Sequence, residues 1–199
     1  MNDRRDGQQD VLYTIGHSNH EIEKFIELLC QHEINVVADV RSSPYSAYSS
    51  QFNREHLQAM LKQAGIAYVF LGEQLGARRA EEECYVDGKV SFDLAAKTPA
   101  FIEGLERLRG GVAEHRVALM CSEKDPMTCH RGLLICRNLR GGEIAMRHIL
   151  EDGSIETHQA AESRLLAICK LPPGDLFDGK ETLIEEAYRR QGERCAFVD

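Results

Sequence analysis

The feature that most constrains the fold is a repeated alternation of short apolar runs with amphipathic helical runs. Five runs are typical of buried strands, at residues 11–15, 36–40, 67–71, 117–120 and 144–150. Apolar residues at helical spacing or helix-capping residues follow these runs along most of the chain. Strands that alternate with helices form right-handed crossover units around a mostly parallel sheet. We therefore expect a single α/β domain with a Rossmann-like three-layer arrangement, in which helices flank the sheet and the C-terminal tail is helical.

Capping residues predict where several helices begin and end. The spacing of a capping box occurs at 18–21 and again at 182–185, and Asn53 is a candidate N-cap. Thr98-Pro99 resembles an N-cap followed by proline at the first helical position. The pair Gly110-Gly111 predicts the end of the helix that starts there.

The length of 199 residues suits one domain with a sizeable core. We expect residues 1–10 to form a flexible N-terminus and residues 11–170 to form the α/β domain. Residues 171–199 are expected to be a helical extension packed on the same domain. Residues 72–97 show little periodicity and many charges, which predicts a long loop or a small insertion.

Composition restricts the classes of function. The chain is 43% hydrophobic and 28% charged, as in ordinary globular proteins, and its net charge of −8 argues against a protein that coats nucleic acid. The N-terminus lacks the apolar region of a signal peptide, and no apolar run approaches the roughly 20 residues of a membrane span. We expect a cytoplasmic protein without a membrane segment. In that reducing compartment the seven cysteines are thiols or ligands rather than disulfides. The sequence does not indicate an oligomeric state.

The segments that follow four of the predicted strands carry most of the reactive side chains. They read GHSNH, DVRSSPYSAYSSQF, GEQLGARR and CSEKDPMTCHR. The carboxyl ends of parallel strands meet at one edge of a sheet, and ligands of open α/β folds bind there. Helix N-termini at the same edge favour anions. We therefore expect one cleft lined by His17, Ser18, Asp39, Arg41, Ser43, Tyr45, Arg78, Arg79, Cys121, Lys124, Cys129, His130 and Arg131.

Four sequence blocks point to a known family. YTIGHS, DVRSSPYS, FLGEQLG and LMCSEKDPMTCHR resemble the signature blocks of the bacterial and archaeal family catalogued as domain of unknown function 488. The resemblance extends from about Tyr13 to His158. It implies a compact α/β fold in which these blocks are gathered together, and it implies no particular activity.

Cys129 is the first candidate for chemistry. With Thr128 as the expected N-cap, Cys129 is the first residue of a helix, where the helix dipole and nearby cations lower a thiol pKa. It is therefore a candidate nucleophile or redox thiol, or else a small buried hydrophobic residue. His130 should point away from it, because adjacent helical residues are about 100° apart. His17 is the better catalytic partner, and Asp39 is a candidate general base or an organiser of the loops. The spacing excludes the Cys-x5-Arg loop of phosphatases and rhodaneses.

The arginines indicate an anionic ligand. Guanidinium groups bind phosphate or carboxylate through paired hydrogen bonds, so Arg41 and Arg131 are candidate ligand-binding residues. The remaining candidates for ligand binding are His130, Ser43, Tyr45 and Lys124. The alternative is that the arginines form internal pairs, Asp39 with Arg131 or Asp125 with Arg41. The ligand we expect is small and phosphate-bearing or nucleotide-like, and the protein that binds it is an enzyme or a sensor.

Two other classes of function stay open. Cys121, Cys129, His17 and His130 offer sulfur and nitrogen ligands suited to zinc or iron. Their spacing matches no standard metal site, so the sequence requires no cofactor and favours the anionic ligand over a metal- or redox-dependent protein. An accessory protein that binds nucleic acid is disfavoured by the net charge. Neither a Walker A loop nor a GxGxxG motif is present.

Overall fold

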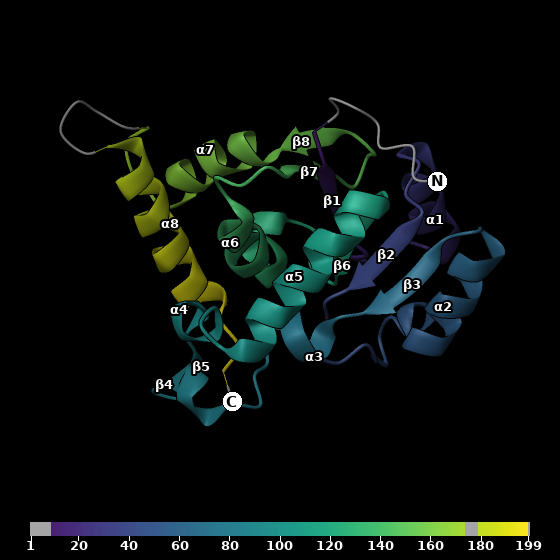
Figure 1. Ribbon diagram of the computed structural model, residues 1–199, viewed down its shortest axis with the longest axis horizontal. Coiled ribbons are helices and arrows are strands. Elements are labelled where there is room, and N and C mark those ends of the chain that lie inside the picture. The colour runs from purple at the N-terminus through teal and green to yellow at the C-terminus, as the bar shows by residue number, and fades with distance from the viewer. Residues whose placement is uncertain (1–8, 174–178, 199) are drawn as a thin grey trace.

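The structure, a computed structural model, describes residues 9–173 and 179–198, so most of the expected flexible segment 1–10 lies outside the described residues. Its centre is a six-stranded sheet with the strand order β3-β2-β6-β1-β7-β8 (Figure 1). The parallel strands are β1 (Val11–Gly16), β2 (Val36–Asp39), β3 (Ala67–Phe70), β6 (Val117–Cys121) and β7 (Ala145–Ile149). The five predicted strands are thus confirmed. One further strand, β8 (Ile155–Thr157), runs antiparallel to β7 at the edge of the sheet.

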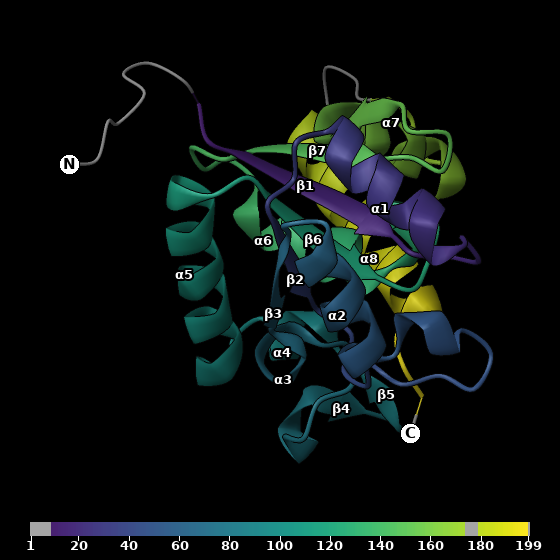
Figure 2. The same ribbon diagram turned by 90° about the vertical axis from the view of Figure 1, so that its right-hand side faces the viewer.

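Helices cover both faces of the sheet, as predicted. One face is covered by α1 (Ile22–Gln31) and α2 (Arg54–Gln63). The opposite face is covered by α5 (Pro99–Glu114), the π-helix η4 (Arg131–Cys136), α6 (Arg137–Leu139), α7 (His158–Ile168) and α8 (Lys180–Cys195). In Figure 2, β2 and β3 lie between α5 and α2. Side chains of β1 alternate between the two layers, since Leu12 belongs to one hydrophobic cluster and Tyr13 and Ile15 to the other.

Segment 72–97 is a small insertion composed of short elements. These are α3 (Gly72–Leu75), the 3-10 helix η2 (Glu82–Cys84), β4 (Tyr85–Val86), β5 (Lys89–Val90) and α4 (Phe92–Ala95). β4 and β5 pair antiparallel through a turn at Asp87-Gly88, where both residues have positive φ. No helix of the described residues combines the length and the apolar character that crossing a membrane requires.

Two predicted capping boxes are wrong. α1 begins at Ile22 and is preceded by Glu21, whose side chain makes no capping hydrogen bond. The helix starts late because the N–H groups of His17 and Ser18 donate to the carbonyls of Cys121 and Ser122, so the chain continues to follow β6 beyond the end of β1. Near the C-terminus, α8 begins at residue 180, ahead of the spacing that suggested a start at 182.

Other helix boundaries agree with the sequence. Thr98 caps α5, because its hydroxyl accepts a hydrogen bond from the Phe101 N–H. Asn53 precedes α2 as predicted, but its side chain accepts a bond from the Ser46 N–H instead of capping the helix. The predicted end at Gly110-Gly111 is wrong, since α5 continues to residue 114. Neither glycine has the positive φ of a helix-terminating residue.

The sheet reverses its winding between β1 and β6. From β1 the chain crosses β6 to reach β2, and from β6 it crosses β1 in the opposite direction to reach β7. Open α/β sheets bind ligands outside the carboxyl ends of the strands at such a reversal. The residues that follow Gly16 and Cys121 therefore occupy the place where the fold favours a site.

Candidate functional site

Four side chains at this reversal direct their polar atoms toward one point. The ligand atoms of Cys121, Glu123, Cys129 and His130 all lie within 4.8 Å of one another. Both sulfur atoms are 3.0 Å from Glu123 Oε2. His130 Nδ1 is 3.6 Å from Cys121 Sγ and 3.8 Å from Cys129 Sγ. We call these four residues the Cys-His cluster.

The local backbone explains why residues from a strand and a helix meet here. Cys121 ends β6, and the chain then returns through the 3-10 helix η3 (Pro126–Thr128). Asp125 caps η3 by accepting a hydrogen bond from the Met127 N–H at 2.8 Å. Cys129 is extended, with φ −133° and ψ 144°, so the prediction that Thr128 caps a helix beginning at Cys129 is wrong. The helical offset of about 100° between adjacent side chains therefore does not apply to Cys129 and His130. Both side chains reach the cluster.

A hydrogen bond to a residue outside the cluster orients the His130 ring. Its Nε2 lies 2.9 Å from the carbonyl oxygen of Val40, at the end of β2. A carbonyl only accepts hydrogen bonds, so Nε2 carries a proton, and Nδ1 faces the two sulfur atoms. Histidine ligands of metal ions are commonly held in this way, with the second ring nitrogen donating to a backbone carbonyl.

The surroundings of Cys121 and Cys129 shift the pKa values of the two thiols in opposite directions. Burial raises the pKa of Cys121 well above its usual value. Burial also acts to raise the pKa of Cys129, but the hydrogen bond from Cys121 and the positive charges of Arg131 and His130 outweigh it and hold that pKa well below its usual value. Although Glu123 is exposed as a residue, partial desolvation of its carboxylate and the neighbouring Cys129 raise its pKa. The surroundings therefore favour the thiolate form of Cys129 over that of Cys121.

Arg131 directly follows His130 in the chain and is fully buried. Its guanidinium donates to the carbonyls of Glu123 at 2.5 Å and Lys124 at 2.9 Å, and its Nε donates to Thr14 Oγ1 at 3.4 Å. Within residues 9–173 and 179–198, no carboxylate forms an ion pair with it. The alternative pairing of Arg131 with Asp39 is therefore wrong. Arg131 fixes the loop that carries Glu123.

A second polar group lies beyond β2 and involves Asp39, Arg41 and His17. Arg41 donates to both carboxylate oxygens of Asp39, at 2.9 and 2.6 Å, and to the Phe52 carbonyl at 2.9 Å. Tyr68 donates to the same carboxylate at 2.8 Å. Asp39 therefore organises the loops, one of its two expected roles. His17 stacks on Phe52 at 4.3 Å, and its Nε2 is 3.4 Å from Arg41 Nη1.

The metal ligands considered from the sequence included His17 and not Glu123. In the structure, Glu123 joins Cys121, Cys129 and His130, and His17 lies outside the cluster. His17 is held by Arg41 and Phe52 instead. Glu123 was missed because Cys-x-Glu is no standard metal motif. The one signal for it was its position two residues after the end of a strand whose loop already carried two cysteines.

Several other predicted site residues are engaged elsewhere. Asp125 pairs with Arg164 at 2.6 Å, so the alternative pairing with Arg41 is wrong. The rest are at the periphery: Ser43 is exposed, Tyr45 donates to Glu55, Lys124 pairs with Glu151, Arg78 stacks over Phe197 and Arg79 pairs with Glu81. These contacts leave the expected common cleft divided among several local networks.

A pocket of about 580 Å³ lies beside the loop that follows Glu123. Its charged lining consists of Lys124, Asp125, Glu151, Asp152, Glu156 and Arg164. Both cations form ion pairs with acidic residues of the same lining. The acidic groups outnumber the basic ones, so this pocket does not favour an anion.

Close backbone contact at Gly16 gives a first prediction. A Cβ atom at Gly16 would lie 1.9 Å from the carbonyl oxygen of Glu123, the oxygen that accepts from Arg131. We expect Gly16→Ala to push this loop away and to destabilise the protein by about 1–3 kcal/mol, as overpacking does. Gly110→Ala is the control, because a Cβ there meets nothing within 4 Å and alanine favours the helix. Urea unfolding of both variants checks this; equal stability of Gly16→Ala and wild type would contradict it.

His17 makes stability depend on pH. Burial and the neighbouring Arg41 lower its pKa from 6.5 to about 4. The unfolded chain thus binds the proton more tightly, and stability is complete above pH 6.5 and is lost as pH falls toward 4. The shift corresponds to about 3 kcal/mol.

His17→Asn tests this dependence, since asparagine does not titrate and retains a donor for the Ser18 carbonyl that His17 Nδ1 contacts. We expect the free energy of unfolding from urea denaturation to fall less steeply between pH 6.5 and 4.5 in the variant. Parallel pH profiles for variant and wild type would show that His17 makes no such contribution.

Comparison with known proteins identifies the family. The family model described as "Domain of unknown function DUF488" matches residues 21–137, more than half of the chain. The match includes the DVRSSPYS, FLGEQLG and LMCSEKDPMTCHR blocks, while YTIGHS precedes it. No curated protein and no solved structure matches the chain. The matched span carries every residue of the Cys-His cluster, and the chain belongs to the DUF488 family.

Proposed function

We propose that this protein is metal-dependent and that the Cys-His cluster binds a transition-metal ion, with zinc as the best fit. The observation that carries the proposal is the convergence of two sulfur atoms, one imidazole nitrogen and one carboxylate oxygen within 4.8 Å. The sequence ranked this function below an anionic ligand because the ligand spacing matches no standard motif. Geometry, rather than spacing, now supports it.

The distances suit a tetrahedral ion. Bonds to zinc of about 2.0–2.3 Å place tetrahedral ligand atoms roughly 3.3–3.8 Å apart. The distances between sulfur and Nδ1 are 3.6 and 3.8 Å, and those between sulfur and Oε2 are 3.0 Å. A small outward movement of Glu123 would bring the sulfur–oxygen distances into the same range. Mixed sulfur and nitrogen ligands favour zinc over magnesium or calcium.

The charges of the cluster favour a cation. Two thiolates and a carboxylate would repel one another at these distances unless protons or a cation lie between them. A divalent ion with these three anions leaves one net negative charge, which the buried Arg131 guanidinium balances. The burial of Arg131 without a carboxylate partner among the described residues is accounted for in this way.

The exposure of the ligands indicates an open rather than a closed site. Cys121, Cys129 and His130 are buried, whereas Glu123 is an exposed loop residue. Catalytic zinc sites use three protein ligands and keep a fourth position for an exchangeable group. We propose that Glu123 is the ligand that exchanges, so that a substrate or solvent ligand can reach the ion. The chemistry supplied would be that of a Lewis acid.

A redox dithiol is a second candidate. The pKa values of Cys121 and Cys129 are shifted in opposite directions, as suits a thiol that attacks and a thiol that resolves. The expectation that Arg41 and Arg131 bind an anion stays a prediction, with less support because both donate to groups of the protein itself. A small anion can still be the exchangeable ligand of the metal.

Elemental analysis of protein purified without a metal-binding tag tests the proposal. We expect about one zinc ion per chain, as in sites of this ligand set. Cobalt exchanged into the protein should give the visible absorption of a tetrahedral site with thiolate ligands. Absence of both metal and cobalt absorption would refute the metal centre. In that case, rapid alkylation of a single thiol would favour the redox candidate.

A further inference from the structure

A chain of buried hydrogen bonds crosses the core beside the Cys-His cluster. Thr14 Oγ1 is 2.8 Å from His148 Nδ1, and His148 Nε2 is 3.0 Å from His158 Nδ1. His158 Nε2 is 3.0 Å from the Tyr188 hydroxyl, which donates to Glu162 Oε1 at 3.1 Å. All five residues are buried, and they come from β1, β7, α7 and α8. The metal proposal uses none of them.

The Glu162 carboxylate at one end sets the direction of donation for neutral histidines. The carboxylate of Glu162 accepts, so Tyr188 donates to it and accepts from His158 Nε2–H. A neutral His158 then has an unprotonated Nδ1, which accepts from His148 Nε2–H. His148 Nδ1 is in turn unprotonated and accepts from the Thr14 hydroxyl. The oxygen of Thr14 remains free to accept from Arg131 Nε, which lies 3.4 Å away.

Both histidines are suited to the neutral form that this direction requires. Burial lowers the pKa of His148 well below its usual value, and the nearby His158 and Arg131 lower it further. Burial and Arg140 lower the pKa of His158 from 6.5 to about 4. Each ring nitrogen therefore has a single role, as donor or as acceptor.

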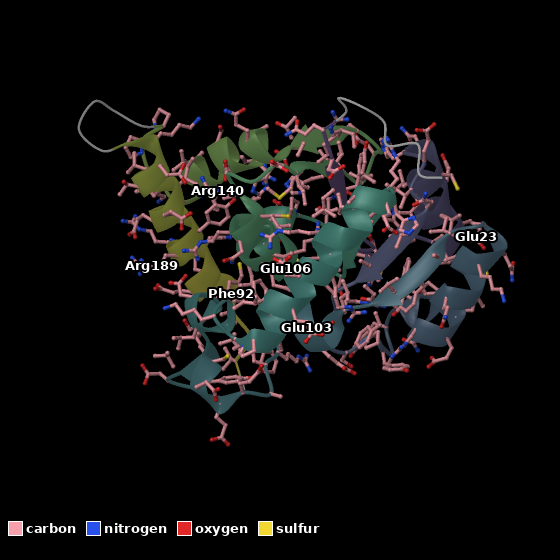
Figure 3. All side chains as sticks on the ribbon, in the orientation of Figure 1. Glu23, Phe92, Glu103, Glu106, Arg140 and Arg189 are labelled. Carbon is pink, nitrogen blue, oxygen red and sulfur yellow. The ribbon has the colours of Figure 1, made fainter. Side chains whose placement is uncertain are left out.

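The far end of the chain is anchored by an ion-pair network. Arg140, labelled in Figure 3, lies where α6, α7 and α8 come together. It pairs with Glu162 of α7 and with Glu181 and Glu185 of α8. The network fixes the acceptor Glu162. Through the series of hydrogen bonds it also fixes Thr14 Oγ1, the acceptor of Arg131 Nε.

We propose that Thr14, His148, His158 and Tyr188 are positioning residues that orient Arg131, and with it the loop and the charge beside the metal ligands. This inference rests on the proposed metal centre for its functional consequence. The hydrogen-bond chain itself can be tested without metal. Arg131 acts on the cluster, and the four residues act through Arg131.

Tyr188→Phe is the main test, because it removes only the hydroxyl that both accepts and donates. Outer partners of metal ligands typically change metal affinity by about 10–100-fold when removed, and for this more distant residue we expect about tenfold weaker Co²⁺ binding. Tyr85→Phe is the matched control, since its hydroxyl donates to the carbonyl of Arg79, outside both the chain and the cluster. If Tyr188→Phe fails to fold, Thr14→Val replaces it as a variant of nearly equal shape.

Nuclear magnetic resonance of the metal-free protein provides the second readout. We expect both His148 and His158 to carry their proton on Nε2, and the Arg131 Nε–H signal to be protected from solvent exchange. The variant should lose this protection, whereas Tyr85→Phe should retain it. A proton on Nδ1 of either histidine, or unchanged Arg131 exchange in the variant, would overturn the inference.

The two proposals fail separately. Wild-type protein that binds no Co²⁺ but shows the expected tautomers and the variant-dependent Arg131 protection refutes the metal centre and retains the positioning role. Protein that binds Co²⁺ with the same affinity and absorption in wild type and Tyr188→Phe retains the metal centre and refutes the positioning role.

Discussion

Cys129→Ser is expected to weaken zinc binding by about a hundredfold, whereas Cys136→Ser should leave it unchanged. Four-ligand zinc sites contribute roughly 10–16 kcal/mol at neutral pH, so one ligand of four supplies on the order of 3 kcal/mol. That energy corresponds to about two orders of magnitude in the dissociation constant. Serine keeps the size of the side chain but offers a hydroxyl that stays protonated.

Cys136 is a suitable control, because it is fully buried in η4 and lies outside the four residues of the cluster. Burial raises its pKa to about 12, so it stays a thiol. Competition with a coloured zinc chelator gives the affinity of each variant. Equal zinc affinity of Cys129→Ser and wild type would exclude Cys129 as a ligand; equal losses in both variants would indicate an effect on folding.

Replacing Arg131 with methionine is expected to cost about 3–5 kcal/mol of stability. Methionine fills much of the same volume, but it leaves the carbonyls of Glu123 and Lys124 without their charged donor. A hydrogen bond to a charged group contributes about 1.5–3 kcal/mol, and two such bonds are lost. The loss should persist in metal-free protein, because these bonds are made to backbone carbonyls and not to the ligand atoms.

Urea unfolding in the presence of a chelator measures this cost. Arg189→Met is the control, since the ion pairs that Arg189 forms among the described residues, with Glu186 and Glu193, lie at the surface. Its loss should leave stability nearly unchanged. Arg131→Lys should also be destabilising, because an ammonium cannot reproduce the forked hydrogen bonds. Wild-type stability of Arg131→Met would show that the guanidinium does not hold the loop.

The strands that were predicted correctly from the sequence are those that are buried. The five parallel strands are covered on both faces by helices, so each reads as a continuous apolar run that is recognisable without tertiary information. β8 was missed because it is a three-residue edge strand whose residues 155 and 157 are exposed. The start of α1 was misplaced because backbone hydrogen bonds to the end of β6, more than a hundred residues away, hold His17 and Ser18 outside the helix.

The fold class, the family resemblance and the edge of the sheet that carries the reactive residues follow from the amino-acid sequence alone, because hydrophobic periodicity and residue type are local properties of the chain. Which of those residues meet depends on the three-dimensional fold. An extended Cys129 and a capped turn bring Cys121, Glu123 and His130 together, while Arg41 is diverted to Asp39. Contacts of this kind depend on backbone geometry between distant segments, and no spacing rule in the sequence encodes them.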